Sequence, residues 1–157
     1  MKKFLLAYLL VGVCCLNVFS DDGFALGVWF DSSKQNIEGI GFGLPVIKNQ
    51  TTEGASLALC GNEVQKMDGF QLALLGFNYS RSFEGVQIAL INMLRKQHGE
   101  FAMQWGFYNQ SAENGIQIGV LNNARNNASF QLGFININKN GLLPVMLFVN
   151  FGKDFFK

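Results

Sequence analysis

Few residues of this 157-residue chain could take part in catalysis or metal binding, and they lie far apart. His98 is the only histidine, so it lacks the Cys and His companions that a zinc site requires. The polar stretch around His98 offers neither the nucleophile nor the orienting partner that a general base needs. Glu38, Asp68, Glu84 and Glu100 could pair for acid–base work, but their regular spacing predicts a solvated rim. We therefore predict no catalytic residue, no metal site and no cofactor.

The glycine-rich segment 39–43 is similar to a phosphate-binding loop. Such a loop needs a following helix whose N-terminus faces the phosphate. Leu44-Pro45-Val46 does not begin a helix, so we expect a strand with small residues on one face. No small-molecule substrate is indicated.

Composition and charge exclude further classes of function. The formal net charge of +1 gives no electrostatic basis for binding nucleic acid. Disorder is excluded because 49% of the residues are hydrophobic and only 15% are charged. The length is that of one domain.

The first twenty residues differ in character from the rest. Lys2 and Lys3 precede an apolar run, residues 4–16, and Ser20 offers a small residue at a cleavage point. This pattern is typical of a secretory signal peptide. We therefore predict a signal peptide at residues 1–20 and a single β-repeat domain at residues 21–157.

The cysteines leave one alternative for this segment. Cys14 and Cys15 lie inside it, and a lipoprotein would be cleaved and acylated at one of them, although the residues before them match that motif poorly. Removal of residues 1–20 leaves only Cys60, so the mature chain has no intrachain disulfide.

An eight-residue phrase recurs along the rest of the chain, at 85–92, 115–122 and 129–136. The steps between equivalent positions are 13 to 17 residues, a period of about fifteen, which is typical of repeat architectures. The first set of equivalent positions is Ala25, Gly41, Ser56, Gln71, Gln87, Gln104, Gln117 and Gln131. A second set of repeat-defining residues is Asn78, Asn92, Asn109, Asn122 and Asn136.

Each copy of the phrase alternates with a period of two, which predicts a β-strand. Val86, Ile88 and Leu90 form a large apolar face, whereas Gln87 and Ala89 lie on the opposite face with glycine. Polar stretches rich in Asn, Gly, Ser and Lys separate the copies and predict turns. The sequence therefore predicts an all-β protein of about nine short strands.

Two architectures fit these strands, and we favour an antiparallel meander closed into a barrel. In a bacterial outer membrane the large apolar face would meet lipid, and the Gly, Ala and Gln face would fill a narrow interior. Three apolar residues per strand span roughly 15–20 Å, which is thin beside the band of about 25 Å in membrane barrels.

The alternative is a parallel β-solenoid with one repeat per coil. Here we expect the apolar face inside and the Gln and Asn residues in external or corner ladders. Ile88 would then be buried and Gln87 in water, whereas the barrel places Ile88 in lipid. Segment 122–127 has almost nothing apolar with which to seal such a core.

The phrases at 85–92, 115–122 and 130–137 resemble bacterial surface repeat proteins, found notably in spirochaetes, built from Gly-Leu-Gln-Ile-Gly-Leu-Ile-Asn units. The ending at 140–151 is similar to the closing unit of that family. The resemblance implies export to the outer membrane or cell surface, no enzymatic activity and no catalytic residues to transfer.

We therefore expect a structural or host-interaction role, with outer-membrane lipid, another envelope component or a protein as partner. The alternative function is a soluble or peripherally attached β-solenoid binding module, located in the periplasm or at the surface.

Overall fold

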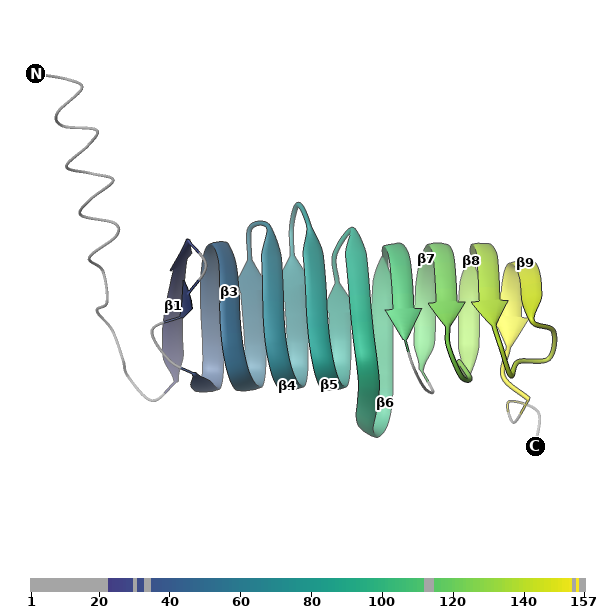
Figure 1. Cartoon of the computed structure of the whole chain (residues 1–157), viewed down its shortest axis with the longest axis horizontal. Helices are drawn as coiled ribbons and strands as arrows, with labels where there is room; N and C mark the ends of the chain where they lie inside the picture. Colours follow the sequence, from purple (N-terminus) through teal and green to yellow (C-terminus); the bar gives the residue numbers. More distant parts are fainter. Residues whose placement is uncertain (1–22, 30, 33–34, 112–114, 154, 156–157) are drawn as a thin grey trace, which may run out of the picture.

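The computed structural model of the chain describes residues 23–29, 31–32, 35–111, 115–153 and 155. These residues form a parallel β-solenoid of about seven turns, with no helix among them (Figure 1). The solenoid alternative is therefore confirmed, and the antiparallel meander closed into a barrel is wrong. The signal peptide predicted at residues 1–20 lies outside the described residues.

The strands of the described residues lie in a single stack. Its order is β2-β1-β3-β4-β5-β6-β7-β8-β9, so each strand from β3 onward pairs with the next in the chain. Pairing is parallel from β1 to β8, and antiparallel only for β2 and β9 at the two ends. The strands are β1 (Phe24–Trp29), β2 (Asp31–Ser32), β3 (Asn36–Ala58), β4 (Gly61–Ala73), β5 (Phe77–Ile88), β6 (Ile91–Ser111), β7 (Ile116–Ala124), β8 (Phe130–Asn138) and β9 (Val145–Phe151).

Each coil is flattened, and Figure 1 shows its two layers of strand segments joined by turns at both edges. One layer consists of the segments that carry the repeat glutamines, such as 70–73 in β4 and 86–88 in β5. The other consists of the segments that begin with the repeat asparagines, such as 78–80 in β5 and 92–94 in β6. We call these layers the Gln wall and the Asn wall.

The structure pairs residues that occupy equivalent positions in the repeat. On the Gln wall, Gln71 pairs with Gln87, Gln87 with Gln104, Gln104 with Gln117 and Gln117 with Gln131. The offset between paired residues is 15 from β3 to β4 and 13 from β6 to β7, so coil length varies while register is kept.

The longest coil has its extra length at one turn. Phe83 pairs with Gln97, an offset of 14, but Gly85 pairs with Ala102, an offset of 17. Strand β6 therefore carries three extra residues there, and in Figure 1 its lower turn extends beyond those of its neighbours.

Four stacked glycines make the turn from the Asn wall to the Gln wall in the first coils. The backbone φ angles of Gly39, Gly54, Gly69 and Gly85 are 131°, 130°, 129° and 124°. Residues other than glycine rarely adopt such values. A Cβ added to any of the last three would also meet the carbonyl oxygen of the glycine in the preceding coil. The tight stacking of this edge therefore requires glycine.

The C-terminal end is closed by a reversal of the chain. Asn138 N donates to Pro144 O at 2.9 Å, and Leu142 N donates to Phe151 O at 2.8 Å. Asn150 Nδ2 donates to Leu143 O at 3.0 Å. These bonds hold residues 141–144 against the last coil while β9 runs antiparallel to β8, and this reversed strand is the atypical last unit of the sequence.

Replacing Gly69 with alanine tests the glycine edge. We expect Gly69→Ala to lower the free energy of unfolding by about 2 to 6 kcal/mol, because backbone strain and local crowding each cost about 1 to 3 kcal/mol. Denaturant unfolding followed by circular dichroism measures it. The matched control is Gly23→Ala, whose Cβ meets nothing closer than 3.8 Å. Equal stability of the two variants would contradict the requirement.

Candidate interaction surface

The interior of the solenoid is lined by amides. Both sets of repeat-defining residues are buried with 1% or less of their surface exposed: Gln71, Gln87, Gln104, Gln117, Gln131, Asn78, Asn92, Asn109, Asn122 and Asn136. The expectation of external ladders and an apolar interior is therefore wrong for these residues, whereas the asparagines do stack at a corner of the coil. Large apolar side chains gather inside mainly near the glycine edge, where Val64, Met67, Phe83 and Leu94 form a cluster.

The glutamines form one continuous ladder along the solenoid axis. Each glutamine from Gln87 to Gln131 donates from Nε2 to Oε1 of the glutamine one coil earlier, at 2.7 to 2.9 Å. Only the ladder ends, Gln71 Nε2 and Gln131 Oε1, are glutamine side-chain atoms of this ladder without a hydrogen-bond partner in the described chain. Ser80 Oγ also donates to Gln71 Oε1 at 2.8 Å, which joins the two walls.

The asparagines form a second ladder at the opposite edge from the glycine turns. Each asparagine from Asn62 to Asn122 donates from Nδ2 to Oδ1 of the asparagine in the following coil, at 2.7 to 3.0 Å, and Asn136 at the end donates to Gly133 O at 2.8 Å. Nδ2 also reaches main-chain carbonyls of the Gln wall, as in Asn78 to Ile88 O at 3.0 Å and Asn109 to Ile118 O at 2.8 Å. The asparagines therefore hold both the coils and the two walls together.

Two asparagines of the interior were missed by the repeat pattern. Asn62 begins the ladder and donates to Asn78 Oδ1 at 2.7 Å, and its spacing of 16 residues from Asn78 was the available signal. Asn138 exchanges two hydrogen bonds with the backbone of Ala128, at 3.1 and 2.9 Å. Near segment 122–127, which has no large apolar side chain, the core is filled by buried Ala124 and Ala128 and by the hydrogen bonds of Asn138.

The large apolar side chains of the repeat project outward from the Gln wall. Ile88 is half-buried on this outer surface and Gln87 is fully buried, the reverse of the expectation for a solenoid. The central row of this surface is Phe42, Leu57, Leu72, Ile88, Trp105, Ile118 and Leu132. The row beside the asparagine edge is Leu44, Leu59, Leu74, Leu90, Phe107, Val120 and Phe134. We call the whole outer surface of the Gln wall the apolar surface.

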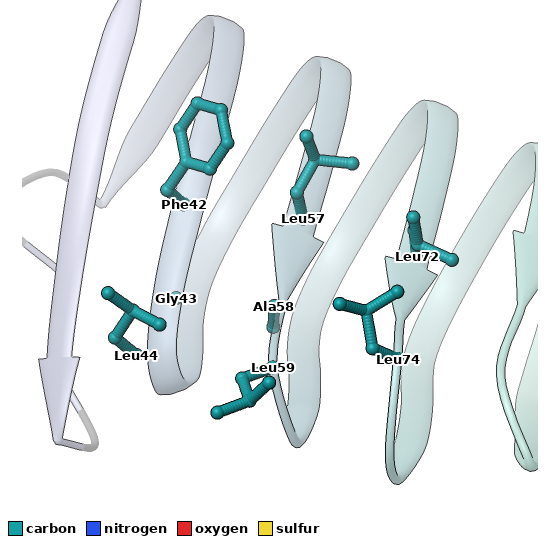
Figure 2. A pocket seen from close by; sticks show the side chains of 8 residues that line it. All are labelled: Phe42, Gly43, Leu44, Leu57, Ala58, Leu59, Leu72 and Leu74. Carbon is teal, nitrogen blue, oxygen red and sulfur yellow. The ribbon is translucent and has the colours of Figure 1, made fainter.

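Figure 2 shows the packing of two rows of the apolar surface over three neighbouring coils. Phe42, Leu57 and Leu72 follow one line, and Leu44, Leu59 and Leu74 follow a second line beside it. An apolar groove of about 280 Å³ lies between them. The rows are open to solvent, since Leu74 is 62% exposed, as Trp105 (57%) is further along the surface.

The outer surface of the Asn wall is polar. Its exposed positions include Lys48, Gln65, Arg81, Arg95 and Lys96. Lys48 Nζ lies 2.8 Å from Glu63 Oε2, in an ion pair that is open to water. The solenoid is therefore amphipathic, with one wall apolar outside and the other polar.

An acidic rim borders the apolar surface at the glycine edge. Glu53, Asp68 and Glu84 stack in register, with Glu38 exposed in the preceding coil. Lys66 Nζ lies 3.0 Å from Asp68 Oδ2. The hydrogen bond and charge of Asp68 raise the pKa of the Lys66 ammonium, with smaller contributions from Glu53 and Glu84. Glu38 and Glu53 are exposed, whereas Asp68 and Glu84 are half-buried, so the rim is partly solvated. The side chain of Glu100, which was predicted to belong to the rim, lies outside the described part of the structure, as does that of His98.

The described residues contain no group of three or more His, Cys, Asp or Glu side chains that could hold a metal ion. In the same ranges no helix has the length and hydropathy needed to cross a membrane. Comparison of the chain with family models, curated proteins and solved structures finds no match. The apolar surface is therefore the candidate functional site of the described residues.

Replacing Gln104 with leucine tests the ladder. The change leaves Gln87 Oε1 and Gln117 Nε2 buried without a partner. At about 1 to 3 kcal/mol per orphaned atom, we expect the free energy of unfolding to fall by about 2 to 6 kcal/mol. Chemical denaturation measures this loss.

Two matched variants make that test specific. Gln131→Leu stands at the end of the ladder and orphans only one ladder atom, Gln117 Oε1, so its loss should be roughly half as large. Gln65→Leu lies on the exposed Asn wall and should change stability little. Equal losses for Gln104→Leu and Gln65→Leu would show that the ladder does not stabilise the fold.

Proposed function

We propose that the protein is an exported, non-catalytic repeat protein of the bacterial cell surface, and that it works as an association module through its apolar surface. The observation that carries this proposal is the unbroken set of outward apolar rows on the Gln wall. Contiguous exposed apolar patches beyond a few hundred Å² mark interaction sites in proteins that are otherwise soluble.

The size of the apolar surface supports association. The Gln wall has nine strand passes, because β3 contributes two and β1 and β4 to β9 one each. With nine passes about 4.8 Å wide and the outward positions covering about five residues of each pass, the surface measures roughly 43 by 17 Å, or about 700 Å². Leaving this area in water is unfavourable, at about 25 cal/mol per Å² of apolar surface. Burial of this apolar area against a partner would therefore stabilise the complex.

The proposed location is supported by the sequence. The predicted signal peptide at residues 1–20 implies export, and the resemblance of the repeats to bacterial surface proteins implies the outer membrane or cell surface. A structural or host-interaction role agrees with a fold in which the ion pairs Lys48–Glu63 and Lys66–Asp68 lie on the polar wall and rim.

Cysteine labelling in intact bacteria tests this proposal. In a chain whose native cysteines are replaced by alanine, Arg81→Cys places a thiol on the Asn wall and Leu90→Cys places one on the apolar surface. We expect a membrane-impermeant maleimide to label Arg81→Cys, because that wall faces the medium. Leu90→Cys should be protected at least tenfold, because a partner covers it.

The other outcomes separate the two halves of the proposal. If neither thiol is labelled in intact cells but both react after lysis, the protein does not lie at the cell surface. If both thiols react equally in intact cells, nothing covers the apolar surface and the association function is wrong.

A further inference from the structure

We propose that the apolar surface is covered by a second copy of this chain, packed face to face about a two-fold axis. This inference rests on the proposed function, because it names the partner of the same surface. It is argued from the area, shape and charge of the two walls.

The area of the surface matches that of a stable dimer interface. Such interfaces bury about 800 Å² per partner, and a flat area of about 700 Å² reaches this value once side-chain relief is added. The ends of the solenoid are much smaller, since walls about 10 Å apart and about 17 Å high enclose only about 170 Å². Face-to-face packing is therefore the mode of self-association that this solenoid can sustain.

The regular shape of the surface suits a copy of itself. Its side chains lie in straight rows with the spacing of the strands, and the close-up in Figure 2 shows neighbouring rows with a groove between them. Two such sheets pack about 10 Å apart with their rows interdigitated. A two-fold axis makes the contact self-complementary and closes it at two copies.

The charges around the surface favour a protein partner over an anionic lipid surface. Peripheral membrane proteins place Lys and Arg beside their apolar face to contact anionic headgroups. Here the rim of the first coils carries Glu38, Glu53, Asp68 and Glu84, and Lys66, the cation described there, is paired with Asp68. Arg125 and Lys139 are exposed only after β7 and β8, and Arg81 and Arg95 project from the opposite wall. In a face-to-face dimer the acidic rims lie at the edge in water, and both polar walls face outward.

The centre of the interface is Ile88. It belongs to the central row and to β5, the fifth of the nine passes on the Gln wall. A two-fold axis in the interface plane passes near the centre of the surface whichever way it runs. Ile88 should therefore face Ile88 of the other copy.

The mass of the purified exported protein tests the dimer. We expect light scattering at micromolar concentration to give twice the mass of one chain. The double variant Leu90→Lys, Trp105→Lys should be monomeric, with its dissociation constant raised at least 100-fold and its β-sheet circular dichroism kept, because both side chains are exposed in one chain. Arg81→Asp on the Asn wall is the matched control and should stay dimeric.

Thiol cross-linking gives an independent readout. Because sheets about 10 Å apart are too far for a direct disulfide, we use a bifunctional thiol reagent that spans this distance. With the native cysteines replaced by alanine, the reagent should join Ile88→Cys of two copies, whereas it should not join Arg81→Cys. Failure of Ile88→Cys to cross-link any faster than Arg81→Cys would overturn the face-to-face arrangement.

Vesicle binding separates failure of the dimer from failure of the proposed function. A native protein that stays monomeric, but floats with phosphatidylethanolamine–phosphatidylglycerol vesicles unless Leu90 and Trp105 are replaced, would overturn the dimer and keep the association function. A native protein that is monomeric and binds no vesicles would overturn the dimer. If Leu90→Cys and Arg81→Cys were also labelled equally in cells, the proposed function would be overturned as well.

Discussion

The hydrogen bonds between side-chain amides of neighbouring coils determine how this solenoid is built. A side-chain amide can donate a hydrogen bond to the coil on one side and accept one from the coil on the other. These bonds bridge the distance between paired strands only if the same residue recurs in every coil. Gln87 and Gln104 meet this condition although 17 residues separate them, whereas 13 separate Gln104 from Gln117. Turns can therefore change length, provided that each coil returns its Gln and Asn to the ladders. A buried amide without a partner costs more than a made bond contributes, so register is enforced strongly.

The position of the large side chains follows from the ladders. The amides and the small residues beside them, such as Gly106 and Gly119, occupy the interior near the asparagine edge, where a Cβ on Gly119 would already crowd Asn109. Large side chains at alternate positions must then project outward, since neighbouring residues of a strand face opposite sides. The Asn wall alternates in the same way but carries polar residues outside. The difference between the outer surfaces of the two walls thus arises from residue type at otherwise equivalent positions.

Much of the fold could be predicted from the sequence, and the errors have a common physical cause. The period of the phrase predicted all-β coils, and its alternation predicted the two unlike faces. Alternation is the same in parallel and antiparallel strands, so it could not decide between solenoid and barrel. The side of the Gln face was misjudged for the solenoid because its interior was expected to be apolar. The barrel interpretation had the faces right and the topology wrong. Asn62 and Asn138 escaped notice because their neighbours depart from the repeated phrase. The spacing indicated Glu38, Asp68 and Glu84 of the acidic rim but missed Glu53.

Each strand of the stack pairs only with its immediate neighbours, which makes this protein extensible. Duplication of the DNA that encodes one coil would add one glutamine and one asparagine to the ladders and one strand to the apolar surface. All other contacts would stay the same. Deletion would do the opposite. A change in the number of repeats therefore changes the length of the molecule and the area of its apolar surface. No substitution in the existing repeats is needed.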